Sequence, residues 1–360
     1  MRDLVKAGIQ VLKADFPHIA FFATAHCNIG CNHCFYRERI RTAGKRDELS
    51  LDEIKKISES LGNIYSLTLT GGEPTLRDDL IGIAKVFYGQ NRLRLLSLHS
   101  NGYAPEKLLM IARGILNGCP GMRLLVSLSL DGLEQKHDAL RIAGSFQGVL
   151  ESVRCLKPLL AHRNFELFIN TTLMPENQDD IMAIHDYVVN VLHLPHDVSY
   201  LRGRKLKKRE HDSMLKAYKS YKDRNDTPAA AGAASLIRDI IIRTGKDFIC
   251  QAERGDGRLP CQALRKSIVI NETGEVFPCE VLASSVGNLR EFGYDVKRLL
   301  QSKKAECMRS EIEGKCCSCT WECIMPVNIL YSVQGRIALL RNLARYSLTN
   351  LGLASKRASR

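Results

Sequence analysis

Three cysteines lie within one short stretch, with the spacing C-x3-C-x2-C, directly after the apolar run Ile19–Thr24. They are Cys27, Cys31 and Cys34. Thiolates are soft ligands that select iron–sulfur clusters, zinc or copper(I). Because a cubane [4Fe–4S] cluster has four irons, three cysteines leave one iron open to bind a substrate or cofactor. The alternative is a zinc site, in which His26 or His33 supplies the fourth ligand.

A second group of cysteines begins at Cys261, in the pattern C-x12-G-x4-C that ends at Cys279. The segments Ser267–Asn271 and Glu275–Pro278 are predicted strands joined by a turn at 272–274, which is a hairpin signal. Such a hairpin brings Cys261 and Cys279 together. The later cysteines of this group surround Trp321 and are Cys316, Cys317, Cys319 and Cys323. Their spacing also permits a four-cysteine zinc ribbon.

Glycines and polar residues end the strand candidates that follow the first cysteine group. Tyr65–Thr70 runs into Gly71-Gly72-Glu73-Pro74. The paired glycines let the backbone approach a ligand closely or take a positive φ, and Pro74 starts the next turn rigidly. A plain tight turn between a strand and a helix remains the alternative. Ser100-Asn101-Gly102 ends the next strand candidate in a similar way.

A further polar run, Ser129 to Asp131, ends the strand candidate Arg123–Leu130, and Arg141 follows it. Arg141 suits a carboxylate ligand because its guanidinium presents a planar fork of donors. Without the neighbouring motifs, a surface arginine on a helix would explain it equally well.

Taken together, these motifs resemble the radical S-adenosylmethionine (radical SAM) superfamily, with a C-terminal auxiliary-cluster domain of the Twitch or SPASM type. The resemblance extends from about residue 16 to residue 326. In the family an aromatic residue often precedes the last cysteine; here that residue is His33, and Phe35 follows Cys34. The residues that the resemblance implies for SAM binding are Gly71, Gly72, Glu73, Pro74, Ser100, Asn101, Ser129, Asp131 and Arg141.

The resemblance implies reductive cleavage of SAM to a 5′-deoxyadenosyl radical, which abstracts a hydrogen atom from the substrate. Ser129 and Arg141 are expected to hold the SAM carboxylate, and Asp131 to support the site. Two [4Fe–4S] clusters are expected, together with an electron donor such as flavodoxin or ferredoxin. The predicted ligands of the auxiliary cluster are Cys261, Cys279, Cys319 and Cys323, with Cys316 and Cys317 as alternates.

The elements that must position these residues alternate between strands and helices. The strand candidates are Ile19–Thr24, Tyr65–Thr70, Leu93–His99, Arg123–Leu130, Phe165–Leu173 and Val198–Leu201. This alternation predicts an α/β fold with βαβ units and a parallel sheet. The family resemblance implies a partial (βα)6 barrel over residues 1–225. A small cysteine-rich β-hairpin/α auxiliary-cluster domain is expected at 226–326, and a basic tail at 327–360.

Composition places limits on the class of protein. The 360 residues are 45% apolar and carry no secretory signal and no apolar stretch of transmembrane length. Closely spaced cysteines in a long chain indicate metal binding in a reducing compartment, so a cytoplasmic location is expected. The formal net charge is +13, with a basic segment at 202–224 and no acidic residue from 324 to 360.

The basic tail alternates leucines with arginines, which predicts an amphipathic helix on an anionic membrane surface at the inner face. The alternative is a helix packed against the barrel with its arginines outward. A nucleic-acid partner is not expected, because the tail offers only Tyr331 and Tyr346 for stacking.

The predicted substrate is therefore anionic, and lipid- or carrier-linked. A peptide substrate recruited by a separate leader-binding protein is one alternative. A non-catalytic iron–sulfur or zinc regulator is another, although Gly71–Pro74 argues against it because a regulator needs no SAM pocket.

Overall fold

The computed structural model describes residues 10–42, 47–204, 206–224, 233–253, 259–280, 282, 284–315 and 322–358. One nine-stranded sheet runs through this part, in the order β6-β5-β4-β3-β2-β1-β7-β8-β9. Its strands are β1 (Phe16–Thr24), β2 (Ile64–Gly71), β3 (Leu95–Ser100), β4 (Arg123–Ser129), β5 (Phe165–Leu173), β6 (His196–Tyr200), β7 (Ser267–Ile270), β8 (Glu275–Phe277) and β9 (Gly287–Asn288).

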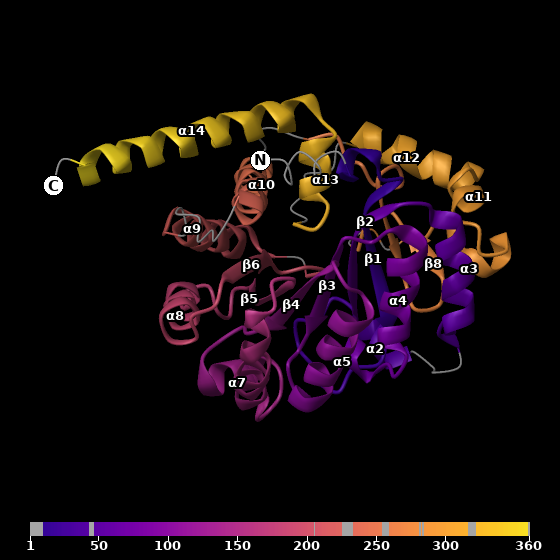
Figure 1. Cartoon of the computed structure of the whole chain (residues 1–360), viewed down its shortest axis with the longest axis horizontal. Helices are drawn as coiled ribbons and strands as arrows, with labels where there is room; N and C mark the ends of the chain where they lie inside the picture. Colours follow the sequence, from indigo (N-terminus) through magenta and orange to yellow (C-terminus); the bar gives the residue numbers. More distant parts are fainter. Residues whose placement is uncertain are drawn as a thin grey trace.

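Helices connect the parallel strands β1 to β6 and cover one face of the sheet (Figure 1). Their apolar faces pack on strand residues such as Leu67, Leu98 and Val126. The predicted α/β class with a partial barrel is confirmed. The connecting elements are α2 (Arg37–Thr42), α3 (Leu51–Leu61), η2 (Pro74–Leu76), α4 (Leu80–Asn91), α5 (Pro105–Gly118), α6 (Glu134–Leu140), α7 (Ser145–Leu156), η3 (Lys157–Ala161), α8 (Ile181–Asp186) and η4 (Tyr187–Val191).

The opposite face of the sheet is mixed: polar side chains lie on its middle strands, and a small apolar cluster of Ala20, Phe22 and Val269 lies on β1 and β7. Burial alternates along β3 and β5, as expected of strands with one face in the core. On β3 the side chains of Leu96 and Leu98 lie in the core, whereas Ser97 and His99 between them are only half-buried. The parallel strands end at the same edge of the sheet, so the loops that follow them meet there.

The predicted hairpin is confirmed: β7 and β8 pair antiparallel, with Ile270 opposite Val276. A feature that the sequence did not indicate is that β7 also pairs parallel with β1. The His18 ring, near the start of β1, lies 3.3 Å from Ser267 Oγ and 3.1 Å from Thr68 Oγ1. The cysteine-bearing hairpin therefore extends the barrel sheet, and the domain boundary at residue 226 stays a prediction.

The remaining helices follow the barrel and the hairpin. They are α9 (Lys208–Arg224), α10 (Ala233–Glu253), η5 (Leu289–Phe292), α11 (Val296–Leu300), α12 (Lys303–Lys315), α13 (Met325–Leu330) and α14 (Val333–Ala358). Helix α13 spans the predicted start of the tail, and its Val327 and Ile329 side chains are buried. Helix α14 passes α10 and projects beyond it to the C-terminus (Figure 1).

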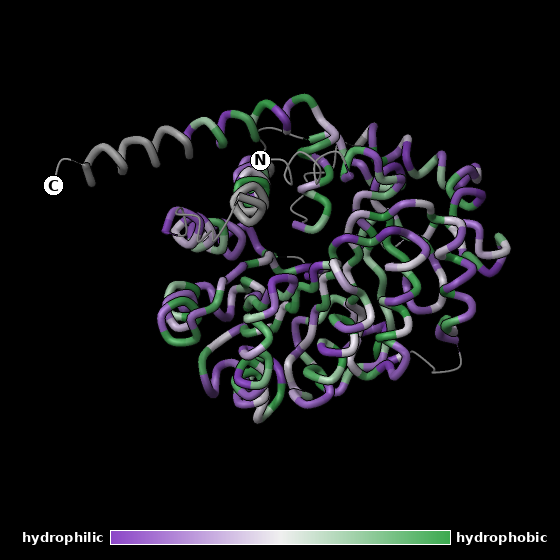
Figure 2. The backbone as a smooth tube through the Cα atoms, viewed as in Figure 1, coloured by the Kyte–Doolittle hydropathy of each residue, from purple (hydrophilic) through white to green (hydrophobic). Residues whose placement is uncertain are grey.

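Helix α14 is attached to α10 through one face. The Asn342 amide donates to Thr244 Oγ1 at 3.0 Å and to Asp247 Oδ2 at 3.3 Å. Hydrophobic and hydrophilic residues alternate along the first half of α14 (Figure 2). Among the helices of the described part, none combines the length and the apolar character that crossing a bilayer requires.

Candidate active site

The first cysteine group forms a coiled loop between the carboxyl end of β1 and the start of α2. The amide of Cys34 donates to the Cys31 carbonyl at 3.3 Å, and the amide of Arg37 donates to the Cys34 carbonyl at 3.3 Å. All three thiols are half-buried. Burial raises the pKa of Cys27 to about 11, so a thiolate at this position needs a positively charged partner such as a metal centre.

Two side chains from neighbouring loops direct donors at these sulfurs. Asn101, after β3, lies with its amide nitrogen 3.9 Å from Cys27 Sγ and 2.7 Å from Asn28 Oδ1. Arg141, after α6, lies with Nη1 3.8 Å from Cys31 Sγ. Three half-buried thiols with donors aimed at them fit the donor set of a [4Fe–4S] cluster. No group of three His, Cys, Asp or Glu side chains in the described residues is arranged around a single metal ion.

Asp131 connects this loop to the end of β4. Its carboxylate is fully buried and accepts from Arg141 Nε and Nη2, both at 2.7 Å. It also lies 3.2 Å from His33 Nε2 and accepts from the Thr172 amide at 2.8 Å. Burial would raise the pKa of Asp131, but the Arg141 guanidinium and the His33 hydrogen bond outweigh it and hold the pKa well below its ordinary value.

The predicted roles of Asp131 and Arg141 stay predictions. Asp131 lies where a supporting residue would be expected. Two of the guanidinium nitrogens of Arg141 are already engaged by Asp131, which leaves Nη1 directed at Cys31. Ser129 is half-buried at the end of β4, opposite Asn170 in the register.

The paired glycines after β2 lie against the backbone of the cysteine loop. Gly71 has φ +130°, and a Cβ there would be 2.3 Å from the Thr24 carbonyl oxygen. A Cβ at Gly72 would be 2.1 Å from the His26 carbonyl oxygen. The Gly72 amide donates to Thr24 O at 2.8 Å and the Glu73 amide to His26 O at 2.7 Å. The two glycines therefore permit a close approach between the β2 loop and the backbone of the cysteine loop.

Glu73 is buried and connects two of the loops. Its carboxylate accepts from Ser100 Oγ at 2.9 Å and from the Asn101 amide at 2.7 Å. It also accepts from the hydroxyl of Thr75 at 2.7 Å, and Pro74 begins the short helix η2. The carboxylate thus holds the β2 and β3 loops together at the carboxyl edge of the sheet.

The second cysteine group is partly described. Cys261 and Cys323 pack against the same apolar cluster, which includes Ile312. Cys279 belongs to the segment that follows β8. The predicted ligand Cys319 and the alternates Cys316 and Cys317 lie outside the described residues.

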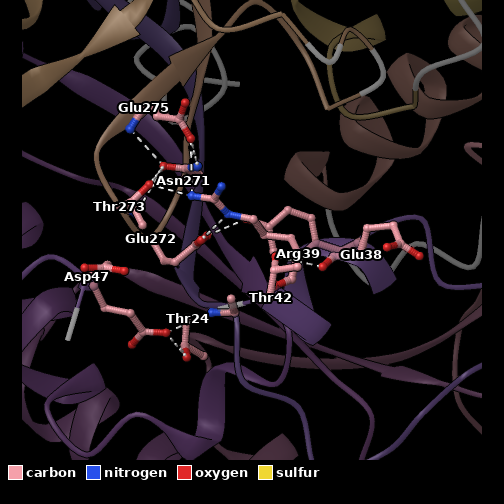
Figure 3. A network of polar contacts seen from close by, with 12 residues as sticks. Thr24, Glu38, Arg39, Thr42, Asp47, Asn271, Glu272, Thr273 and Glu275 are labelled. Carbon is pink, nitrogen blue, oxygen red and sulfur yellow. Dashed lines mark hydrogen bonds and ion pairs between the residues drawn. The ribbon is translucent and has the colours of Figure 1, made fainter. Parts of the chain in front are cut away.

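A polar network joins the helix after the first cysteine loop to the hairpin turn of the second region (Figure 3). Arg39 of α2 donates to Glu272 Oε1 at 2.7 Å and to Thr273 Oγ1 at 2.7 Å. It also lies 3.2 Å from Glu275, and the Tyr36 hydroxyl donates to Glu272. Sequence reasoning missed these residues, because only the pairing of β7 with β1 brings the turn to α2.

Comparisons with known proteins agree with this geometry. The family model "Radical SAM superfamily" matches residues 22–188. The AdoMet-dependent heme synthase of Methanosarcina barkeri is 26% identical over 333 residues, which are 84% of this chain and 88% of that protein. The pre-heme d1 synthase of Dinoroseobacter shibae is 27% identical over 197 residues, which are 52% and 45% of the two chains.

Two solved structures share the fold over most of the chain. Native anSMEcpe with bound AdoMet has a TM-score of 0.58 and 16% identity, covering 93% of this chain and 98% of that one. Streptococcus suis SuiB bound to S-adenosylmethionine has a TM-score of 0.57 and 14% identity, covering 86% and 71%. Both carry C-terminal regions of the SPASM or Twitch type.

Radical SAM enzymes use a [4Fe–4S] cluster and AdoMet, as predicted for the first cysteine group, while the second cluster stays a prediction. The matched range begins within β1 and ends within η4. It therefore contains the cysteine loop and the loops after β2, β3 and β4 that contact it. Residues 22–188 are therefore a radical SAM domain, and the chain is a radical SAM enzyme.

Proposed function

We propose that this enzyme removes a hydrogen atom from an anionic, lipid- or carrier-linked substrate, and that an auxiliary [4Fe–4S] cluster assists in its oxidation or modification. The observation that carries the proposal is the convergence of strand-end loops on the first cysteine group. Asn101 and Arg141 reach the Cys27 and Cys31 sulfurs from the third and fourth units of the barrel, at 3.9 and 3.8 Å. Hydrogen bonds to sulfur are one means by which a protein tunes such a cluster.

The proposed ligands of the first cluster are Cys27, Cys31 and Cys34, and SAM would bind beside it between the loops at 71–74, 100–101 and 129–141. When bound, these cofactors supply the one-electron chemistry that removes the hydrogen atom. The protein supplies a rigid frame. Glu73 fixes the β2 and β3 loops to each other, and Asp131 holds the Arg141 guanidinium in place. Both carboxylates are buried, so water does not compete for these contacts.

Charge supports an anionic substrate. The chain has a formal net charge of +13. The first two relatives are named for making heme and a heme d1 precursor, and heme itself is a dicarboxylate. The basic segment 202–224 contributes less positive charge than its composition suggests, because carboxylates pair with four of its ten Lys and Arg residues, namely Arg202, Arg204, Lys222 and Arg224.

A peptide substrate is the second candidate, and one observation favours it. SuiB, which shares this fold, has been solved with its precursor peptide SuiA at a TM-score of 0.53. A likeness at 13% identity is a likeness of fold, so it leaves the anionic substrate as the first proposal. In the peptide case a separate protein would recognise the leader.

The proposed partners are an electron donor such as flavodoxin or ferredoxin, and an anionic membrane surface at the cytoplasmic face. The support for the membrane contact is the exposed apolar face of α14, where Val333 is 61% and Leu340 is 64% exposed.

Anaerobic reconstitution tests the proposal. With both clusters bound, about eight irons per chain are expected, and SAM with dithionite should yield 5′-deoxyadenosine. Cys34→Ala should abolish this cleavage, because it removes a ligand of the cluster with an open iron. Cys279→Ala should leave uncoupled cleavage in place and eliminate product formed from the native substrate. Cys155→Ala, at a single half-buried cysteine, is the matched control and should change neither.

Two results would contradict the proposal. A reconstituted protein that holds zinc and no iron would exclude the cluster chemistry. Full product formation by Cys279→Ala would remove the auxiliary cluster from the reaction.

A further inference from the structure

Arg202 follows the last barrel strand, β6, and is directed toward the second cysteine group. Its side chain is only 20% exposed. Nη1 donates to Glu280 Oε2 at 2.9 Å, and Nη2 donates to Glu322 Oε2 at 3.0 Å. One guanidinium thus binds two carboxylates that are far apart in the sequence, and both acids are well buried.

The two carboxylates are direct neighbours of predicted cluster ligands. Glu280 follows Cys279, and Glu322 precedes Cys323. Glu322 is also fixed to the barrel, because its second oxygen accepts from the Tyr200 amide at 2.9 Å. Arg202 therefore holds two cysteine-bearing segments at a set position against the end of β6.

The same guanidinium lies against the first cysteine loop. Its central carbon is 5.9 Å from the centre of the Phe35 ring, and Phe35 directly follows Cys34. The next residue, Gly203, has φ +73°, and a Cβ there would be 3.2 Å from Phe35 Cβ. The backbone that carries Arg202 consequently packs on the first loop as well.

The geometry points to Arg202 as the positioning residue that joins the two cysteine centres: it holds the Cys279 and Cys323 segments against the first cysteine loop and places a fixed positive charge beside the auxiliary cluster. This inference deepens the proposed function and rests on the auxiliary cluster that it contains.

The positive charge of Arg202 should shift the reduction potential of the auxiliary cluster in a definite direction. Reduction adds an electron to a cluster, and a nearby cation stabilises the reduced form relative to the oxidised form. Without Arg202 this positive charge would be lost, and the oxidised form of the cluster would be favoured. Its guanidinium also cannot lose its proton, so the positive charge is present at every working pH.

The test is a redox titration of the reconstituted full-length enzyme, followed by electron paramagnetic resonance, with an iron assay on the same samples. SAM binds only at the open iron, so the signal that SAM leaves unchanged belongs to the auxiliary cluster. In Arg202→Gln we expect a more negative midpoint potential for that signal, or a loss of about half of the iron with the SAM-sensitive signal retained. In Arg202→Lys the potential should lie closer to that of the wild type.

Arg204→Gln is the matched control, because Arg204 is an exposed neighbour that pairs with Glu176 instead. It should leave the potential and the iron content unchanged. A wild type with both clusters and an Arg202→Gln variant with the same potential and iron content would overturn the inference. So would a shift in Arg202→Lys as large as that in Arg202→Gln. A wild type with a single cluster would instead contradict the proposed function.

Discussion

At Gly72 the space that a side chain would need is occupied by the backbone of the cysteine loop. A Cβ there would be 2.1 Å from the His26 carbonyl oxygen and 2.9 Å from the Ala25 oxygen. Real Cβ atoms do not approach backbone atoms this closely. Because the neighbouring amides of residues 72 and 73 bond to the same loop, the glycine sets the position of the first cysteines.

The first prediction follows from this contact. Gly72→Ala must displace the backbone before Cys27, and a misplacement of about 1 Å can cost a reaction on the order of 100-fold. We expect SAM cleavage to fall by about that factor and the iron of the first cluster to be incorporated incompletely. Iron content and 5′-deoxyadenosine formation measure the two effects.

Gly30→Ala is the control for Gly72→Ala. Gly30 lies within the cysteine loop, but nothing is within 4 Å of a Cβ built there. The variant should retain iron and activity. Equal loss in both variants would show that the loop tolerates no added methyl group anywhere, and the specific role of Gly72 would be wrong.

At this scale the sequence predicted which residues would gather, but not how they contact each other. The cysteine spacing and the Gly-Gly-Glu-Pro turn were visible as motifs. That Glu73 binds the β3 loop, and that Asp131 binds both Arg141 and His33, depends on which strand ends are neighbours in the sheet. Side-chain pairing over such sequence distances leaves no local pattern.

At the scale of elements, the strands were predicted well because their apolar residues are contiguous or alternate. The predicted strand Phe165–Leu173 coincides with β5, and the other five barrel strands overlap their predictions. The pairing of β7 with β1 and the helix α10 were not predicted. Pairing partners are set by the tertiary fold, and a short strand such as β7 carries no signal for its neighbour.

Glu53 joins α3 to the segment after β9. Glu53 closes the N-terminal capping box of α3 with Ser50. It also pairs with Arg290 at 2.7 Å and accepts from the Tyr294 hydroxyl at 3.0 Å. Despite partial burial, the Arg290 hydrogen bonds, the Ser50 amide and Tyr294 lower the pKa of Glu53 to about 2. The pair therefore joins the barrel to the region that carries the second cysteine group.

A carboxyl with a depressed folded-state pKa adds stability above its ordinary pKa of 4.5 and loses it as pH falls through about 2. Glu53→Gln keeps a capping side chain but removes the charge. We expect it to lower the free energy of unfolding by about 1 kcal/mol at neutral pH. The difference from the wild type should shrink as pH falls from 4.5 toward 2 and disappear below that range. Denaturant unfolding of the metal-free protein at several pH values measures it.

Glu59→Gln is the matched control, at an exposed position on the same helix. It should change the free energy of unfolding little at any pH. A constant difference between Glu53→Gln and the wild type across the whole pH range would mean that packing, and not charge, accounts for the effect.

At the scale of the whole molecule, the excess positive charge is unevenly neutralised by carboxylates. Carboxylates neutralise part of the segment 202–224, whereas residues 324–360 contain no acid at all. The sequence allowed two interpretations of α14, a helix on a membrane surface and a helix packed on the rest of the protein. Different faces of α14 agree with each of them. Asn342 binds α10 on one face. Val333, Ile337 and Leu340 are exposed on another, at the spacing of successive helical turns.

Helical geometry places Arg336 and Arg341 on either side of this apolar stripe, because residues one position before Ile337 and one after Leu340 are turned about 100° away from them. Long basic side chains in such positions can reach phosphate groups while the stripe enters the headgroup region. Each basic residue near an anionic bilayer contributes about 1 kcal/mol. The arrangement therefore favours binding along the membrane plane, with α10 on the side away from the lipid.

We predict that the purified full-length enzyme sediments with liposomes that contain phosphatidylserine, and that salt releases it because the attraction is screened. Ile337→Ser combined with Leu340→Ser should weaken this binding at least about tenfold, since each apolar side chain loses on the order of 1 kcal/mol or more of burial. SAM cleavage should stay unchanged, because neither residue lies near the cysteine loop. Met110→Ser, which removes a 55% exposed apolar side chain from α5, is the matched control and should bind as the wild type does. Undiminished sedimentation of the double variant would place the membrane contact elsewhere, and failure of the wild type to sediment would leave α14 as a helix packed on α10 with its arginines in solvent.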